Sequence, residues 1–150
     1  MILIETVLLP ADDAGREIDT LRLTWEERRK SRQKLVTTAG RAVGLALPTG
    51  TTLLPGDVLH RERGLSIVVE GVPERVLVLS PESVREACLC CHQLGNLHRP
   101  IALAQVGDAP EIVTPYESAI VTALARIGVP FEAQERVFTH AGAGPTAHDQ

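Results

Sequence analysis

The order of strand-like and helix-like segments in the second half of the chain constrains its fold more than any other feature. Strand-like segments lie at 75–79, 100–106, 111–113 and 131–138. Helical periodicity separates the first strand from the second and the third from the fourth. The order β-α-β-β-α-β is that of the split βαβ unit of ferredoxin-like folds. We therefore predict an α+β sandwich over residues 74–138.

Both helices of this region are predicted from capping residues and apolar stripes. The first is expected to begin at Ser80–Glu82, where a serine N-cap precedes a proline and an acid, and to end at Gly95-Asn96. The second is expected to begin at the capping box Thr114–Glu117 and to end at Gly128. Helical spacing predicts two buried stripes, namely Val84, Ala87, Cys88 and Cys91, then Ile120, Ala123, Leu124 and Ile127.

The first half of the chain consists of short strand-like segments between glycine and proline turns. Strands are expected at 2–9, 41–47, 57–60 and 65–70. A turn at Arg63-Gly64 is expected to join the last two as a hairpin. Aromatic residues make up 3% of the sequence, so the core must be mostly aliphatic. We predict a small β-domain over residues 1–73, and a flexible tail rich in glycine, alanine and proline over residues 139–150.

The segment Trp25–Lys34 permits two structural interpretations. Its composition favours a helix, with two acids followed by five basic residues, but it has no apolar stripe. A basic patch for RNA or for an acidic partner is one functional interpretation. A solvated face of a strand or turn is the simpler one, and we favour it.

Charge and hydropathy exclude several classes of protein. The formal net charge of −4 argues against a general nucleic-acid-binding protein, which is usually basic. No apolar run approaches the roughly 20 residues that span a bilayer, and no basic region precedes the first apolar residues. We expect a cytoplasmic protein that binds neither nucleic acid nor membrane. Its three clustered cysteines are then expected to be free thiols.

The cluster Cys88–Cys91 contains a C-x-x-C spacing, but its setting does not favour redox chemistry. Redox pairs usually open a helix, where the positive end of the dipole stabilises a thiolate, and this pair lies late in the predicted helix. Cys88 and Cys91 are expected to be small buried hydrophobes, and Cys90, which lies off the stripe, is the more reactive candidate. A closed zinc site would need a second cysteine pair, which the sequence lacks. A thiol-based redox protein or a cysteine-dependent enzyme stays open as an alternative.

His98 is placed to present its imidazole at the surface. It follows the predicted helix end at Gly95-Asn96 and precedes Pro100, which is expected to begin a strand. One imidazole alone is a poor metal site, but on a two-fold axis it would meet its own copy from a second subunit. Two facing imidazoles suit nickel, copper or zinc. From these residues alone, a surface histidine without a ligand is the simpler interpretation.

Five segments of the sequence resemble the UreE family, the nickel metallochaperones of urease maturation. They lie at 23–33, 43–59, 75–79, 94–103 and 129–132, and so extend over nearly the whole chain. The resemblance implies a peptide-binding-like N-terminal β-domain, a ferredoxin-like metal-binding domain, and a homodimer joined through the latter. It also implies a non-enzymatic carrier of Ni²⁺, with Zn²⁺ or Cu²⁺ as substitutes. The implied partners are the GTPase UreG, the urease apoprotein and its other accessory proteins.

The same resemblance implies where the metal binds. The G-N-R-H motif of the family reads Gly95-Asn96-Leu97-His98 here, which assigns nickel to His98 of both subunits. Further candidate ligands are His140 and His148 in the tail, and a candidate second, softer site comprises Cys90, Cys91 and His92. Leu97 replaces the arginine of the motif, so a partner-binding module that has lost nickel delivery is a second alternative. The resemblance also assigns Trp25–Lys34 to the β-domain, against its helical propensity.

Overall fold

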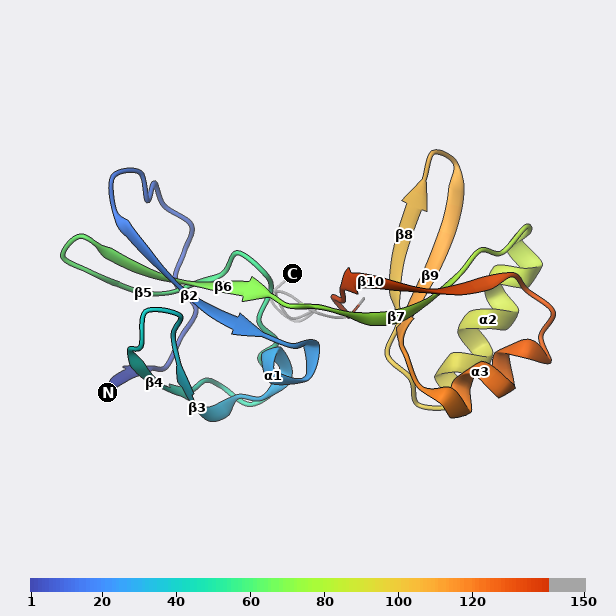
Figure 1. The fold of residues 1–150 in the computed structure, drawn as a ribbon, viewed down its shortest axis with the longest axis horizontal. Coiled ribbons are helices and arrows are strands. Elements are labelled where there is room, and N and C mark those ends of the chain that lie inside the picture. The colour runs from blue at the N-terminus through green and yellow to red at the C-terminus, as the bar shows by residue number, and fades with distance from the viewer. Residues whose placement is uncertain (141–150) are drawn as a thin grey trace. The chain divides into compact units, whose positions relative to one another are not determined.

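The computed structural model describes residues 1–140 and divides into two compact units (Figure 1). Unit 1 comprises residues 1–72, and unit 2 begins at Pro73. Each unit has its own sheets, and two of the three helices belong to unit 2, which confirms the predicted α+β fold class. No helix within residues 1–140 is long and apolar enough to cross a membrane.

Unit 1 contains two three-stranded sheets. The first has the order β1-β4-β3, formed by Ile2–Ile4, Ala42–Ala46 and Arg32–Val36. The second has the order β2-β6-β5, formed by Glu17–Leu23, Leu65–Gly71 and Val58–Glu62. The pairs β1–β4 and β2–β6 are parallel, and the other two pairs are antiparallel. The antiparallel pair β5–β6 is the hairpin that the sequence predicts.

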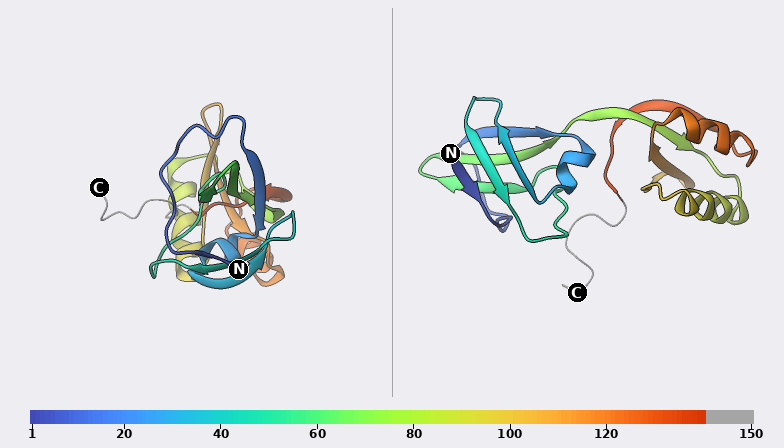
Figure 2. Two further views of the ribbon diagram at one scale, coloured as in Figure 1. Left: turned by 90° about the vertical axis from the view of Figure 1, so that its left-hand side faces the viewer. Right: turned by 90° about the horizontal axis from the view of Figure 1, so that it is seen from below.

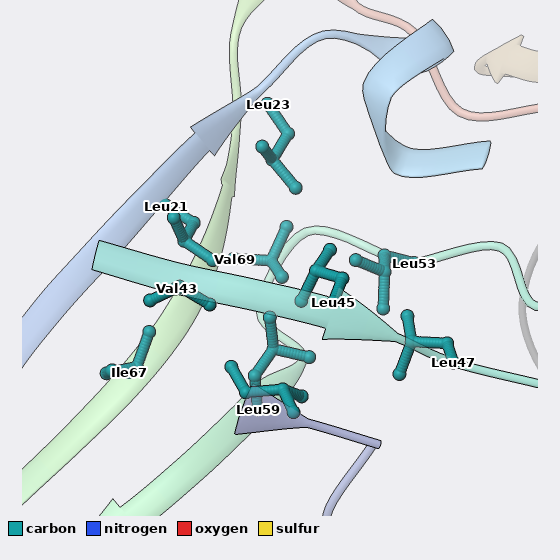
Figure 3. Close-up of a cluster of buried hydrophobic side chains, with 10 residues drawn as sticks. Leu21, Leu23, Val43, Leu45, Leu47, Leu53, Leu59, Ile67 and Val69 are labelled. Carbon is teal, nitrogen blue, oxygen red and sulfur yellow. The ribbon is translucent and has the colours of Figure 1, made fainter. Parts of the chain in front are cut away.

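Ten buried aliphatic side chains form the core of unit 1 (Figure 3). The members are Ile4, Leu21, Leu23, Val43, Leu45, Leu47, Leu53, Leu59, Ile67 and Val69. Eight come from strands of both sheets, and Leu47 and Leu53 come from the connection between β4 and β5. Within β2 the inward aliphatic residues are Leu21 and Leu23, as the period of two in a strand requires. The prediction of an aliphatic core is confirmed for this unit.

A short helix, α1 (Trp25–Arg29), follows β2. Thr24 Oγ1 accepts a hydrogen bond from the N–H of Glu27 at 3.2 Å, and Glu27 Oε1 accepts one from the N–H of Thr24 at 3.0 Å. The prediction that helical propensity is overruled throughout Trp25–Lys34 is therefore wrong for the first five residues, while β3 occupies the end of the segment. No apolar stripe is needed, because a capping box and one buried side chain, that of Arg28, accompany a helix of little more than one turn.

Unit 2 is a four-stranded antiparallel sheet with two helices packed on it (Figure 1). In chain order its elements are β7 (Pro73–Leu79), α2 (Val84–Asn96), β8 (Ala102–Val106), β9 (Ala109–Pro115), α3 (Ser118–Ala125) and β10 (Phe131–Val137). The strand order β10-β7-β9-β8 confirms the predicted ferredoxin-like βαββαβ topology. The hairpin of β8 and β9 projects beyond the end of β7 (Figure 2).

Both helices of unit 2 begin three residues later than predicted. Their N-caps are Ser83 for α2 and Glu117 for α3. Thr114 and Pro115 instead end β9, where they pair with β7, and the backbone N–H of Ser80 bonds to the segment that leads into β10. Backbone bonds to neighbouring segments therefore hold Ser80, Thr114 and Pro115 outside the helices, and each helix begins a few residues later.

The core of unit 2 corrects half of the predicted stripe of α2: Ala87 and Cys91 face the core as predicted, and Val84 and Cys88 do not. Cys90 and Leu94 are fully buried, whereas Val84 is 81% exposed and Cys88 is also exposed. The inward residues are Ala87, Cys90, Cys91 and Leu94, which pack in one cluster with Leu77, Leu79 and Ile112 of the sheet. The predicted and the observed stripes both have helical spacing, and the sheet selects the one that buries Leu94. In α3 the predicted stripe is correct for Ile120 and Leu124, which are both buried.

Candidate metal site

His98 occupies the turn that ends α2. The helix closes at Asn96 with Leu97 as its C-cap, and His98 follows with a φ of 56°. Within residues 1–140 it is the only residue other than glycine with a positive φ. It is exposed at the helix end, which is where the sequence predicts an exposed imidazole.

Two backbone hydrogen bonds hold this turn in a defined form. The N–H of His98 donates to the carbonyl of Gly95 at 3.0 Å, and the N–H of Arg99 donates to the carbonyl of Leu94 at 2.9 Å. These bonds form a Schellman motif, in which the residue after the C-cap is left-handed. Glycine usually takes that place, because a side chain there costs roughly 1–2 kcal/mol. A histidine in this conformation is strained, and residues of this kind concentrate at functional sites.

The three cysteines have different environments, and Cys88 and Cys90 are exposed and buried in the opposite way to the prediction. Cys90 is fully buried, Cys91 is partly buried and Cys88 is exposed. Burial raises the pKa of the Cys90 thiol, with smaller contributions from Cys91 and Glu86. Burial likewise raises the pKa of Cys91, with a contribution from Cys88. The prediction that Cys90 is the more reactive thiol is wrong, because the phase of α2 turns it into the core.

The side chains of the candidate second metal site are not brought together. His92 is exposed on α2, and its Nε2 lies 3.2 Å from Nδ2 of Asn96, one turn further along. Cys90 faces the core instead. Within residues 1–140, no three histidine, cysteine, aspartate or glutamate side chains are grouped so that they could hold a metal ion. Of the tail candidates, His140 is partly buried at the end of the described chain, and His148 lies outside it.

The structure contains an apolar groove that was not predicted from the sequence, and one of its lining residues, Leu97, directly precedes His98. It lies between α2 and α3 and has a volume of about 350 Å³. Its lining comprises Leu89, Gln93, Leu97, Ala123, Leu124, Arg126 and Ile127. Leu97 directly precedes His98, and it and Leu89 each keep 43% of their surface exposed. Leu89, Gln93 and Leu97 are spaced at i, i+4 and i+8 and so form one row along α2, a signal that could have revealed this surface.

The fold is an α+β fold of two units, and His98 is exposed at the end of α2. Comparison with known proteins identifies the family. Residues 4–70 match the model described as the UreE urease accessory protein, N-terminal domain. The chain is 42% identical over 116 residues to the urease accessory protein UreE of Deinococcus radiodurans, which covers 77% of this chain and 72% of the relative.

Two further relatives agree with this match. The identity is 40% over 124 residues with UreE of a Synechococcus species, covering 83% of this chain and 80% of the relative. The identity with UreE of an Arthrobacter species is 34% over 145 residues, covering 89% of this chain and 90% of the relative. The chain therefore belongs to the UreE urease accessory protein family. Members of this family are accessory proteins and not enzymes, which confirms the predicted class.

Proposed function

We propose that this chain is a nickel carrier of urease maturation, in which a homodimer binds one Ni²⁺ between the His98 imidazoles of both subunits. The observation that carries the proposal is the conformation of His98, which is exposed and left-handed at a helix end although its side chain disfavours that conformation. Membership in the UreE family supports nickel as the cargo. Imidazole also binds zinc and copper, so Zn²⁺ and Cu²⁺ are expected competitors.

The surface near His98 supports a two-fold dimer. Leu89 and Leu97 are exposed apolar side chains on α2, and both line the groove between α2 and α3. Removing such surface from water favours association, and an isologous interface would bring the same row of α2 from both subunits together. Because Leu97 precedes His98 directly, an interface on this row would bring the two imidazoles toward the axis.

The chemistry of the site is binding and release. Nickel binds the neutral imidazole, so protons compete with the metal for this site. His140, His148 and water would complete the coordination shell. With so few protein ligands some positions stay open, and a recipient can bind the metal before the carrier lets it go.

The recipient in this proposal is the GTPase UreG, followed by the urease apoprotein and its other accessory proteins. Family membership supports partners of this kind. Unit 1 offers a surface for them, because Leu3, Ile18 and Val36 are apolar side chains that its sheets leave exposed. The proposal therefore divides the work, with the metal on unit 2 and partner contacts on unit 1.

Calorimetric titration with Ni²⁺ beside a solution mass determination tests the proposal. We expect a dimer that binds one tight nickel per two chains. His98→Ala should lose that binding and stay dimeric, and the matched control His92→Ala, an exposed histidine on the same helix, should keep it. Nickel affinity unchanged in His98→Ala would refute the assignment of His98.

The two alternative functions make different predictions in the same experiment. A thiol-based protein would bind at one nickel per chain and lose binding when its thiols are blocked. The raised pKa values of Cys90 and Cys91 argue against it, because reactive cysteines have lowered ones. A partner-binding module without nickel delivery, which Leu97 in place of the motif arginine suggests, would show no tight nickel at any stoichiometry.

A further inference from the structure

Arg99 follows His98, and its side chain turns back into unit 2. Its Nη1 lies 3.1 Å from Oε2 of Glu117, and its Nη2 donates to the carbonyl of Pro115 at 3.1 Å. Only 19% of the Arg99 side chain is exposed. Because Glu117 is the N-cap of α3 and Pro115 ends β9, the guanidinium connects the end of α2 to the β9–α3 junction.

Further bonds hold the chain on both sides of His98. On the far side, the carbonyl of Pro100 accepts a hydrogen bond from Thr114 Oγ1 at 2.9 Å. Toward α2, the backbone N–H of Arg99 donates to the carbonyl of Leu94, whose side chain is fully buried in the core. The side chain of His98 is exposed, whereas the backbone and side chain of the following Arg99 are bonded to the body of unit 2.

These bonds hold His98 in a left-handed conformation that its side chain disfavours. A residue with a side chain leaves this conformation readily unless its surroundings hold it there. The Schellman bonds alone are common at helix ends that frequently carry glycine. The additional tie through Arg99 therefore compensates for a side chain that the turn disfavours. A metal site with few ligands depends strongly on such orientation. Ordering a mobile ligand costs conformational entropy, and only a few metal–ligand bonds are available to offset that cost.

We propose that Arg99 is a positioning residue for His98: through Glu117 and Pro115 it fixes the left-handed turn and hence the direction of the imidazole. The inference rests on the proposed function, in which His98 is the nickel ligand. Arg99 itself is not a ligand, because a guanidinium has no lone pair to donate to a metal.

Electrostatics and positioning predict opposite signs for the loss of Arg99. A positive charge near a divalent cation repels it, so removing the charge should strengthen nickel binding if Arg99 acts only through its field. If Arg99 positions His98, removing its guanidinium should weaken binding, because the imidazole is no longer held. The direction of the change in affinity therefore separates the two explanations.

The test compares Arg99→Met, Arg99→Lys and the matched control Arg85→Met, which removes an exposed positive charge from α2. We expect Arg99→Met to bind Ni²⁺ about 10-fold more weakly, the lower end for groups that orient a metal ligand. Arg99→Lys keeps the charge but can replace only one of the two contacts, so it should fall in between. Arg85→Met should match the wild type. If Arg99→Met fails to fold, Arg99→Lys carries the test.

A second measurement needs no metal. The NMR order parameter of the His98 amide in the metal-free protein should fall from the rigid range, about 0.85, to below about 0.7 in Arg99→Met and stay unchanged in Arg85→Met. Nickel binding in Arg99→Met that is as tight as in the wild type, or an unchanged order parameter, overturns the positioning role. Unchanged nickel binding in His98→Ala refutes the proposed ligand instead, so the two failures are distinguishable.

Discussion

The carboxylate of Asp19 on β2 of unit 1 and the turn around His98 in unit 2 are both held by several hydrogen bonds, but these bonds have opposite effects. The carboxylate of Asp19 is buried at 1% exposure. It accepts hydrogen bonds from Thr37 Oγ1 at 2.5 Å, Arg41 Nη1 at 2.8 Å, the Thr20 N–H at 2.9 Å, the Ala39 N–H at 3.1 Å and Thr38 Oγ1 at 3.2 Å. In unit 1 the bonds therefore end on the charged group itself and enclose it.

At His98 the bonds end on the backbone and on the following residues, and the imidazole is left exposed. The two groups of hydrogen bonds therefore have different consequences for stability. A buried charge costs several kcal/mol unless it is fully hydrogen-bonded, so the network around Asp19 serves stability. A strained backbone with an exposed side chain costs stability, and in the proposed function this cost is offset because the His98 imidazole is available to bind a metal ion.

Asp19→Ala should produce the largest effect on stability. It leaves Arg41 and buried hydroxyl and N–H groups without their acceptor, and we expect the free energy of unfolding of unit 1 to fall by about 3 kcal/mol. The control is Glu17→Ala, which removes the exposed second partner of Arg41 and should cost less than about 1 kcal/mol. Urea unfolding followed by the fluorescence of Trp25, the single tryptophan, measures both. Equal losses in the two variants would contradict the role given to Asp19.

Acid should weaken unit 1 through the same group. Burial alone would raise the pKa of Asp19, but hydrogen bonds from Thr37, Arg41, Ala39 and Thr38 outweigh it and lower the pKa from 3.8 to about 2. The ionised carboxylate therefore stabilises the folded state above pH 3.8, and this contribution is lost as the pH falls toward 2. The loss is about 2 kcal/mol, at about 1.4 kcal/mol for each pKa unit.

The same tryptophan signal, recorded in urea at pH values from 5 to 2, measures this loss. Asp19→Asn should remove this part of the pH dependence, because the amide does not titrate. An identical pH profile in the variant and the wild type would show that other carboxylates cause the acid sensitivity.

Thiol labelling extends the comparison to a group that is buried without a network. Cys90 is enclosed and its pKa is raised, whereas Cys88 is exposed on the same helix. A maleimide should label Cys88 on the order of 10-fold faster than Cys90 in the folded protein, since the thiolate is the reacting species. Peptide mass spectrometry at timed intervals gives the rates, and in urea all three cysteines should react alike. Faster labelling of Cys90 than of Cys88 in the folded state would contradict the observed phase of α2.

His98→Gly should change the stability least, and it should raise stability where the preceding changes lower it. Glycine adopts the left-handed conformation without cost, so we expect His98→Gly to be about 1 kcal/mol more stable than His98→Ala, which keeps a Cβ there. Both variants should lose nickel equally. Thermal unfolding followed by the helical circular dichroism, which comes mostly from α2 and α3, measures the difference. Equal stability of the two variants would show that the turn carries no strain.

Predictions from local signals held for the order of the elements in unit 2 and for the end of α2, but not for the starts of α2 and α3. The strand and helix order of unit 2 follows from segment composition, and the helix end before His98 follows from Gly95-Asn96. The capping box of Thr24 and Glu27 that starts α1 is also a local signal. The prediction did not consider it, and therefore overruled the helical propensity of this segment. The roles of His98, His140 and His148 as ligands stay predictions.

The sequence by itself determined the order of elements and the place of His98, because turns, caps and hydrophobic period depend on neighbouring residues. Only the tertiary structure decided where α2 begins and which way it faces. Two stripes, the one with Val84 and Cys88 and the one with Cys90 and Leu94, fit the same helical spacing. The free energy that separates them comes from packing against β7 and β9, and the fold decides which face of α2 meets these strands. The tie between Arg99 and Glu117 likewise needed the fold, since it joins residues from the two ends of the β8–β9 hairpin.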